Sequence, residues 1–246
     1  MTTLMITNWK KIDASEGKDV DPTLYRQLIG SLMYLVNTRP NICYTVNTFS
    51  QFMVEPKRGH WAVAKHVLRY IQGIVEHRLL YTQGNDNRQS GFTNANWVGS
   101  SVDRKSTTGY CFNIGSGMTS WCSRKQKVVA LSSAKAGYMA TSTASCEAIW
   151  LRKLLMNLFK RRMEATRILC DNQSCIQLSK NPVFHDQSQH IDIRCHFVKH
   201  CVQRRAVELR YTPTGEQVAN ILTKALGRTA FVYWMEKMGM VKNPFQ

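Results

Sequence analysis

The chain has 246 residues, of which 43% are hydrophobic, so it is long and apolar enough for one large or two small folded cores. Its 33 Lys and Arg residues against 16 Asp and Glu give a formal net charge of +17, which favours an anionic polymer, most simply nucleic acid, as partner. Charge alone leaves open a merely basic protein. No apolar run approaches the length of a membrane span, and the first residues lack the continuous apolar core of a secretory signal. The eight cysteines form no Cys-x-x-Cys pair, so we expect reduced thiols in an intracellular protein without a membrane partner.

The first third of the chain has the pattern of a small helical region. Asp21-Pro22 is typical of an N-cap followed by a first-turn proline, and apolar residues at helical spacing continue to Asn37. Further helices are expected over 41–53 and from about 58 to 72. The last of these carries a basic face, which is either a solvated surface or one that follows phosphates.

The rest of the chain alternates between strands and helices. Polar residues after Tyr81 mark a boundary, and Gly115-Ser116-Gly117 is typical of a tight hairpin turn. Strands are expected over 91–94, 109–114, 118–123, 165–170 and 207–211. Helices are expected over 132–159, about 173–180, 191–204, 215–226 and 231–238. This order predicts a mixed α/β layer with a hairpin-built edge.

Four polar residues fall at strand ends and helix starts that such a sheet would bring to one point: Asn94, Lys135, Asp171 and Asn220. In a two-metal phosphodiesterase, clustered carboxylates at such a point hold two divalent ions about 3.5–4 Å apart. Hard ions such as Mg²⁺ prefer anionic oxygen ligands. Asp171 is the only carboxylate of the four, and is therefore the candidate metal ligand.

Several dense stretches carry a resemblance to one family. They are YRQLIGSLMYLVNTRP (25–40), SQFMVEPKR (50–58), AKHVLRYIQG (64–73), DRKSTTGYCFNIGSGMTSWCSRKQK (103–127), CDNQSC (170–175), HIDIRCHFVK (190–199) and EQVANILTKAL (216–226). Through them nearly the whole chain resembles the C-terminal part of the Pol polyprotein of plant copia-type retrotransposons. The resemblance implies an α/β fold, with an RNase H-like mixed five-stranded sheet and flanking helices, preceded by a small helical region.

The resemblance also implies two domains and two partners. Residues 1–82 would be a helical remnant of the C-terminal, thumb- or connection-like part of the reverse transcriptase region. Residues 83–246 would be an RNase H-like domain with a C-terminal helix. The sequence contains no Tyr-x-Asp-Asp polymerase motif, so the ancestral polymerase domain is an expected partner. The second expected partner is an RNA–DNA hybrid. The expected location is the cytoplasm, a virus-like particle or the nucleus.

The family has metal-binding carboxylates at three positions where this chain has Asn94, Lys135 and Asn220. A single G-to-A change at the first codon position explains each replacement, and also Asn41, where the family motif reads Arg-Pro-Asp. An amide keeps an oxygen but loses the charge, and Lys135 would place an ammonium where a divalent cation belongs, at a cost on the order of several kcal/mol. We predict that the Mg²⁺ or Mn²⁺ binding of the ancestral activity is lost here, and that hydrolysis is impaired.

Three functions remain open at this point. The leading one is a degenerate RNase H-like domain that binds an RNA–DNA hybrid but is impaired in hydrolysing its RNA strand. The alternatives are an active RNase H endonuclease and a non-enzymatic interaction protein that uses the N-terminal helices. Trp97 and Trp121 are either base-stacking platforms or core residues, and core packing is the favoured role. Contacts to nucleic acid are expected from basic residues around the predicted hairpin: Arg104, Lys105, Arg124, Lys125 and Lys127.

His190 has two interpretations. It either lines the nucleic-acid cleft, as a histidine near product release, or caps a helix at the surface. It also belongs to a group with the composition of a zinc site, completed by Cys195, His196, His200 and Cys201. Because the family has Tyr at position 195, we interpret this grouping as accidental.

Overall fold

The computed structural model describes residues 20–83, 88–100, 103–160, 163–180 and 189–243. The chain divides into two compact units. Unit 1 is formed by residues 1–81 together with 224–246, and unit 2 by residues 82–223.

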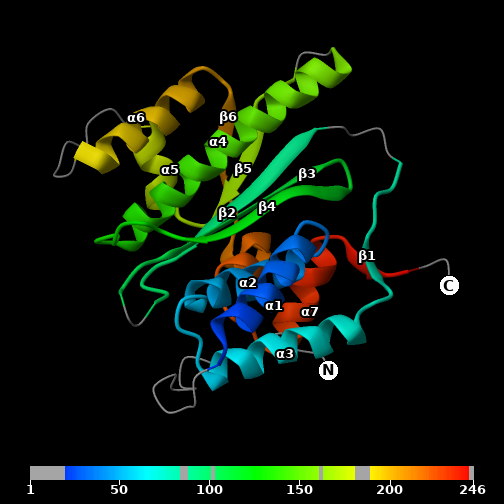
Figure 1. The fold of residues 1–246 in the computed structure, drawn as a ribbon. Coiled ribbons are helices and arrows are strands. Elements are labelled where there is room, and N and C mark those ends of the chain that lie inside the picture. The colour runs from blue at the N-terminus through cyan, green and yellow to red at the C-terminus, as the bar shows by residue number, and fades with distance from the viewer. Residues whose placement is uncertain (1–19, 84–87, 101–102, 161–162, 181–188, 244–246) are drawn as a thin grey trace. The chain divides into compact units, whose positions relative to one another are not determined.

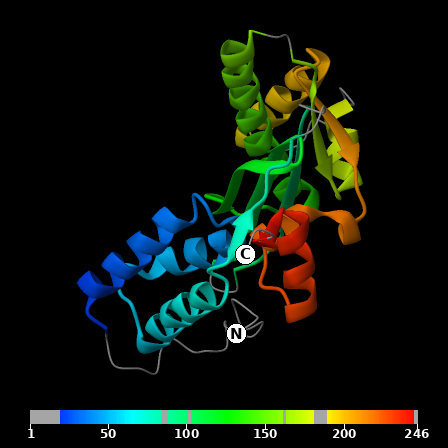
Figure 2. The ribbon, with the colours of Figure 1, turned by 90° about the vertical axis from the view of Figure 1, so that its right-hand side faces the viewer.

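Unit 1 is built mainly from helices (Figures 1 and 2). Its elements are α1 (Pro22–Leu35), η2 (Pro40–Ile42), α2 (Cys43–Phe49), η3 (Ser50–Phe52), α3 (Arg58–Gly73), β1 (His77–Leu79), α7 (Arg228–Lys237) and β7 (Met240–Lys242). The predicted start of α1 is confirmed, because the Asp21 side chain accepts a hydrogen bond from the Thr23 amide at 2.7 Å. The single helix predicted over 41–53 is instead divided into two short 3₁₀ turns and α2.

Buried aromatic side chains hold the helices of unit 1 together. The Tyr25 hydroxyl on α1 donates to the Phe49 carbonyl of α2 at 2.9 Å. On α3, Tyr70 packs edge-on against Phe231 of α7, with ring centroids 5.8 Å apart. The Tyr70 hydroxyl also accepts a hydrogen bond of 2.7 Å from the Asn41 amide nitrogen. The two antiparallel three-residue strands β1 and β7 were not predicted, because a three-residue strand is too short to establish a periodicity.

Unit 2 contains a five-stranded sheet in the order β4-β3-β2-β5-β6. The strands are β2 (Gln89–Asn96), β3 (Thr107–Ile114), β4 (Gly117–Lys125), β5 (Thr166–Cys170) and β6 (Val207–Tyr211). Pairs β2–β3 and β3–β4 are antiparallel, whereas β2–β5 and β5–β6 are parallel. Gly115, with φ of 60°, supplies the left-handed residue that the β3–β4 turn requires. The predicted α/β class with a mixed five-stranded sheet is confirmed.

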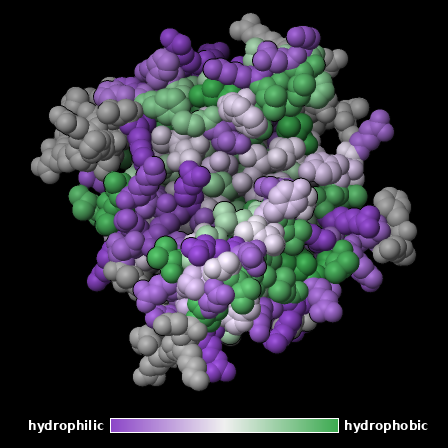
Figure 3. All heavy atoms as spheres, in the orientation of Figure 1, coloured by the Kyte–Doolittle hydropathy of each residue, from purple (hydrophilic) through white to green (hydrophobic). Residues whose placement is uncertain are grey.

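Helices provide the crossovers between the parallel strands. They are α4 (Ser133–Phe159), α5 (Gln173–Lys180) and α6 (Gln189–Gln203), and α4 lies beside α6 (Figure 1). The sheet face toward α4 is tightly packed, since a Cβ on Gly91 would overlap the Phe112 ring. Hydrophobic residues gather over the C-terminal end of α4, at the upper right of Figure 3, and the exposed ones there are Trp150, Leu154, Met156, Leu158 and Phe159.

The opposite sheet face carries the segment that follows β6. The helix predicted over 215–226 is wrong: the chain forms two 3₁₀ segments, η4 (Thr214–Glu216) and η5 (Val218–Leu222). Gln217 separates them because its backbone is extended, with φ −81° and ψ 94°. A Cβ on Gly109 of β3 would lie 2.9 Å from the Leu222 Cβ, so η5 packs directly on the sheet. The division into domains 1–82 and 83–246 stays a prediction about ancestry; the structure groups residues 224–246 with unit 1.

Candidate active-site pocket

Two of the predicted site residues meet at the carboxyl ends of β2 and β5. These strands are parallel neighbours with Thr93 opposite Cys170, so Asn94 and Asp171 follow at the same edge of the sheet. A pocket of about 560 Å³ opens there. Its lining is mostly polar and comprises Asn94, Ala95, Ser133, Gly137, Cys170, Asp171, Asn172, Gln173, Ser174 and Tyr211.

A hydrogen bond between two amides joins Asn94 to Asn220. The Asn94 nitrogen donates to the Asn220 oxygen at 3.0 Å, and the Asn94 oxygen accepts from the Ala95 backbone amide at 2.7 Å. The Asn220 nitrogen donates to the Thr214 carbonyl at 2.9 Å. The side-chain oxygens of both amides therefore already accept hydrogen bonds from the protein.

Buried Gln217 places Asn220 at this edge. Its amide nitrogen donates to the carbonyls of Thr93 in β2 and Leu169 in β5, at 3.1 and 3.3 Å. Its oxygen accepts from the Ala219 amide at 3.2 Å, which fixes the start of η5. One side chain thus ties both strand ends to η5. This residue was not predicted, since a glutamine at the start of an expected helix carries no distinguishing signal.

Lys135 occupies the first turn of α4. The Ser132 side chain caps this helix by accepting from the Lys135 amide at 3.2 Å. In a capping box, the third helical residue is Glu or Gln and reaches back to the cap, and a carboxylate there also suits the positive end of the helix dipole. The half-buried Lys135 supplies neither, and the first turn of α4 contains no acidic residue. One turn further, a Cβ on Gly137 would meet Asn172 at 3.5 Å, an ordinary contact.

Asp171 is the carboxylate that remains in the pocket. The Thr214 hydroxyl donates to its Oδ2 at 3.3 Å. Its neighbour Asn172 is engaged in structure, since its oxygen accepts from the Cys175 amide at 2.9 Å at the start of α5. Cys170 and Cys175 are buried free thiols, as expected. A hydrogen bond with the Cys175 thiol lowers the pKa of Cys170, against the opposing effect of burial.

The residues of this edge do not fit a pair of divalent ions. Two hard cations require several anionic oxygens, whereas the pocket lining contains one carboxylate, Asp171, and the side-chain oxygens of Asn94 and Asn220 already accept hydrogen bonds. Within the described ranges, no group of three or more His, Cys, Asp or Glu side chains is placed to hold a metal ion.

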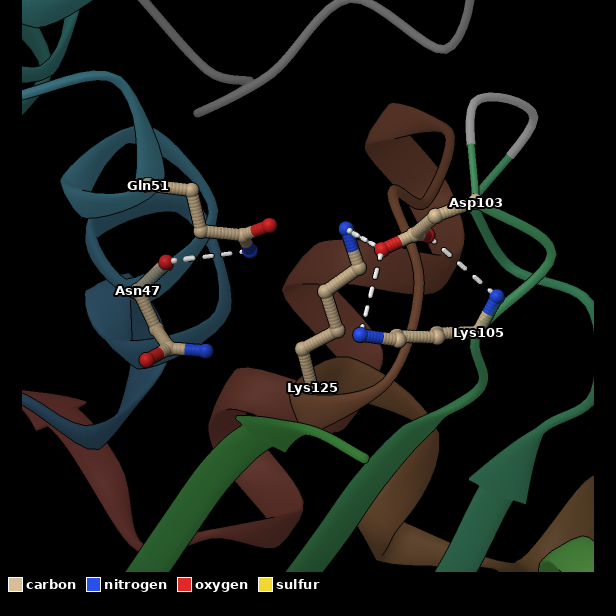
Figure 4. Close-up of polar contacts among 5 residues, drawn as sticks. All are labelled: Asn47, Gln51, Asp103, Lys105 and Lys125. Carbon is tan, nitrogen blue, oxygen red and sulfur yellow. Dashed lines mark hydrogen bonds and ion pairs between the residues drawn. The ribbon is translucent and has the colours of Figure 1, made fainter. Parts of the chain in front are cut away.

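The predicted nucleic-acid contacts fall into two groups. Arg104, Arg124 and Lys127 are exposed. Lys105 and Lys125 are partly buried beside Asp103, with Nζ–carboxylate distances of 3.8 and 2.9 Å (Figure 4). Burial of Asp103 opposes ionisation, but hydrogen bonds from Ser100, Lys125 and the Lys105 backbone lower its pKa to about 2. Figure 4 also draws the Gln51 side chain of unit 1, which donates to the Asn47 carbonyl at 3.4 Å.

His190 lies in the first turn of α6. Its side chain and that of Cys195 fall outside the described part of the structure, so the proposed roles of His190 stay predictions. His196 and His200 are exposed on α6, and Cys201 is buried. None of the helices in the described ranges combines the length and the apolar character that crossing a bilayer requires.

A three-stranded antiparallel edge, two further parallel strands and the long crossover helix α4 make unit 2 an RNase H-like domain, as the sequence predicts. No protein-family model matches the chain. The retrovirus-related Pol polyproteins from transposons RE2 and RE1 of Arabidopsis thaliana are 38% and 39% identical to it, over 99% of this chain and 17% of their own length. The chain belongs to this family and corresponds to a region of a copia-type Pol polyprotein.

A solved structure is also similar to the chain. The LC11-RNase H1 structure, from a compost metagenome, has 13% sequence identity and covers 56% of this chain and 93% of its own, with a TM-score of 0.42. The chain itself spans 17% of the length of the two Pol polyproteins that it matches.

Proposed function

We propose that this Pol region is a degenerate RNase H-like domain that binds an RNA–DNA hybrid and is impaired in hydrolysing the RNA strand. The observation that carries the proposal is the hydrogen bond of 3.0 Å between Asn94 and Asn220. These two positions carry carboxylates in the family that the sequence resembles. Two carboxylates at hydrogen-bonding distance repel unless a cation or a proton lies between them, whereas two amides bind each other directly.

Loss of the divalent ions removes the chemistry that an RNase H needs. In two-metal hydrolysis, the ions activate the attacking water and stabilise the leaving oxygen. Asp171 alone does not supply that charge, and Lys135 adds a positive one at the start of α4. When catalytic groups act together, the effects of losing them on the rate are not additive. The loss of one carboxylate therefore already removes most of the rate.

Binding of nucleic acid depends on different residues and is expected to persist. The net charge of +17 attracts a polyanion, and the exposed Arg104, Arg124 and Lys127 provide positive groups near the hairpin. Replacing carboxylates by amides and a lysine also removes repulsion between the pocket and phosphates. Affinity for a hybrid should fall steeply as salt is raised, because binding releases counterions.

The test compares the wild-type chain with the triple reversal Asn94→Asp, Lys135→Glu, Asn220→Asp on a labelled RNA–DNA hybrid in Mg²⁺ or Mn²⁺. We expect no RNA cleavage above background from the wild type and cleavage at least about 1,000-fold above background from the reversal, the scale on which catalytic groups act. Metal should raise the melting temperature of the reversal but not of the wild type.

A matched control carries Asn47→Asp, Lys65→Glu and Asn37→Asp, which make the same chemical changes on unit 1. It should show neither cleavage nor metal stabilisation. Turnover by the purified wild type would contradict the proposal and support an active endonuclease. A reversal that binds metal but does not cleave would place the defect elsewhere, for instance at Gly137, where the family that the sequence resembles has a second glutamate.

A second candidate is an interaction role with the ancestral polymerase domain. It is favoured by the exposed apolar residues at the C-terminal end of α4, including Leu154 and Leu158, in a chain that spans 17% of its relatives. Co-purification with a separately expressed polymerase region tests it. Leu158→Glu should reduce recovery of the complex, and unchanged recovery would argue against this surface.

A further inference from the structure

Trp97 is the first residue after β2, and it is not a core residue. Its side chain is 47% exposed, contrary to the core role favoured from the sequence. The indole Nε1 donates to the Ala130 carbonyl at 3.0 Å, so the polar edge of the ring is anchored while much of the residue remains open to solvent. A ring that is already fixed loses little conformational entropy when a ligand packs against it.

The anchor places Trp97 beside the pocket. Ala130 packs with Ala136 and Met139 of α4 and with Ala95, and Ala95 is one of the residues that line the pocket. The segment around Ala130 is itself unusually apolar for a surface. Val128, Val129 and Leu131 are 46%, 47% and 75% exposed. An aromatic ring and an apolar segment thus border a polar pocket.

The turn that carries Trp97 is held in an uncommon conformation. Val98 has φ of 51°, in the left-handed region that a β-branched residue rarely adopts, and Arg104 in the same loop has φ of 56°. The Val98 amide donates to the Ser106 hydroxyl at 3.3 Å. Strained backbone of this kind is concentrated at binding and active sites.

Cationic side chains are tied to the same turn. The Gln126 amide donates to the Ser106 carbonyl at 2.8 Å, so the segment before Lys127 is joined to the loop that follows Trp97. Arg104 and Lys127, both exposed, project from these two segments. The nearby acidic residue, Asp103, is paired with Lys125 at 2.9 Å. The surroundings of Trp97 are therefore positive as well as apolar.

We propose that Trp97 is a stacking platform for an unpaired nucleobase, with Arg104 and Lys127 contacting the flanking phosphates. The proposal rests on the proposed function, because it specifies which part of a nucleic acid this domain prefers. Bases inside a duplex are stacked on both faces, so a side chain can stack only on a base at an unpaired end, gap or single strand. An unpaired nucleic-acid end carries phosphates and exposes the face of a base, so it matches both the positive charge and the apolar character of this surface.

The experiment uses the full chain and two labelled RNA–DNA hybrids. One is blunt, and the other has the same duplex with a short unpaired end containing 2-aminopurine, whose fluorescence falls when it stacks. Two variants, Trp97→Phe and Trp97→Leu, both lose the hydrogen bond to Ala130, but Phe alone retains an aromatic face. The control is Tyr34→Leu, which removes an aromatic residue that is 81% exposed on α1.

The wild type should bind the hybrid with the unpaired end about five- to a hundredfold more tightly than the blunt one and should quench the 2-aminopurine. Trp97→Phe and Tyr34→Leu should retain most of the preference and the quenching. Trp97→Leu should lose both, so that it binds the two hybrids with about equal affinity. Thermal melts establish that each variant is folded.

The outcomes separate this proposal from the proposed function. If the wild type binds the blunt hybrid but has no preference for the unpaired end, the platform is refuted and hybrid binding stands. If Trp97→Leu keeps the preference and the quenching, another group stacks the base and the platform is again refuted. If the wild type binds neither hybrid at low salt, the proposed function fails and the platform fails with it.

Discussion

In both units, asparagines stand where the resemblance leads us to expect aspartates, and the consequences differ. In unit 2, Asn94 and Asn220 are close enough to bind each other at 3.0 Å. In unit 1, Asn41 is 1% exposed and donates to the Tyr70 hydroxyl, but its side-chain oxygen has no hydrogen-bond partner among the described residues. When two neighbouring carboxylates are both replaced, the amides satisfy each other. A single replacement in a core leaves one polar atom buried and unpaired, which is costly.

The largest expected effect tests how firmly the amide pair is supported. Gln217→Leu removes the donor to the Thr93 and Leu169 carbonyls and the acceptor for the Ala219 amide. We expect the free energy of unfolding to fall by about 3 kcal/mol, since several buried groups lose partners. Urea denaturation measures it. Gln177→Leu, at an exposed position of α5, is the matched control, and equal losses for the two variants would contradict the bridging role.

Asn41 has one buried polar atom without a partner in the described part of the chain, so the stability of unit 1 should depend on its hydrogen bond to the Tyr70 hydroxyl. Tyr70→Phe removes the hydroxyl that accepts from Asn41 and leaves the amide nitrogen with the weaker hydrogen bond of 3.7 Å to the Met235 sulfur. The expected loss is about 2 kcal/mol. Tyr34→Phe, on the exposed part of α1, should change the stability by less than about 0.5 kcal/mol. The double variant Tyr70→Phe with Asn41→Leu should recover part of the lost stability. If it recovers none, the loss does not come from the Asn41 amide.

A stabilising change is expected at the start of α4. Lys135→Glu restores the capping box with Ser132 and places a negative charge at the positive end of the helix. It should raise the free energy of unfolding by about 1 kcal/mol without any metal present. Lys153→Glu, at an exposed position in the C-terminal third of the same helix, controls for the change in net charge. If the gain appears only when Mg²⁺ is added, the capping argument is wrong and the residue acts through a metal.

The smallest effect concerns acid stability at the hairpin. The pKa of Asp103 is lowered to about 2 in the folded chain from the ordinary 3.8, so its ionised form stabilises the fold. This contribution is present above the unfolded pKa and is lost as the pH falls from about 4 to about 2. Because Asp103 is partly exposed, it should amount to less than about 1 kcal/mol. Asp103→Asn should remove this pH dependence in thermal melts, and an unchanged profile would contradict the assignment.

The sequence predicts those elements that have strong local signals. Asp21-Pro22 identifies the start of α1, and the glycines at 115 and 117 identify the β3–β4 hairpin. The 3₁₀ segments after β6 were predicted as a helix, because the extended backbone of Gln217 is set by hydrogen bonds to distant strands. The spacing of residues along the sequence does not reveal hydrogen bonds between segments that are far apart in the chain.

The candidate site was predicted in part. The resemblance identifies Asn94, Asp171 and Asn220, and the structure brings the first two to one pocket and joins the first to the third. The exposure of Trp97 was not foreseen, since an aromatic residue after a strand is usually buried. Its anchor, the Ala130 carbonyl, is a backbone group and leaves no trace in the sequence.

The amide pair between Asn94 and Asn220 also changes how this edge of the sheet depends on pH and on metal ions. Neither side chain titrates or requires a counter-ion, so chelators should leave the closed edge of the sheet intact. The two single reversals are not equivalent. An aspartate at position 220 can still accept the hydrogen bond from the Asn94 nitrogen, whereas an aspartate at position 94 would face the Asn220 oxygen, because the Asn220 nitrogen donates to the Thr214 carbonyl. Single reversals should therefore disturb this edge least when they begin at position 220.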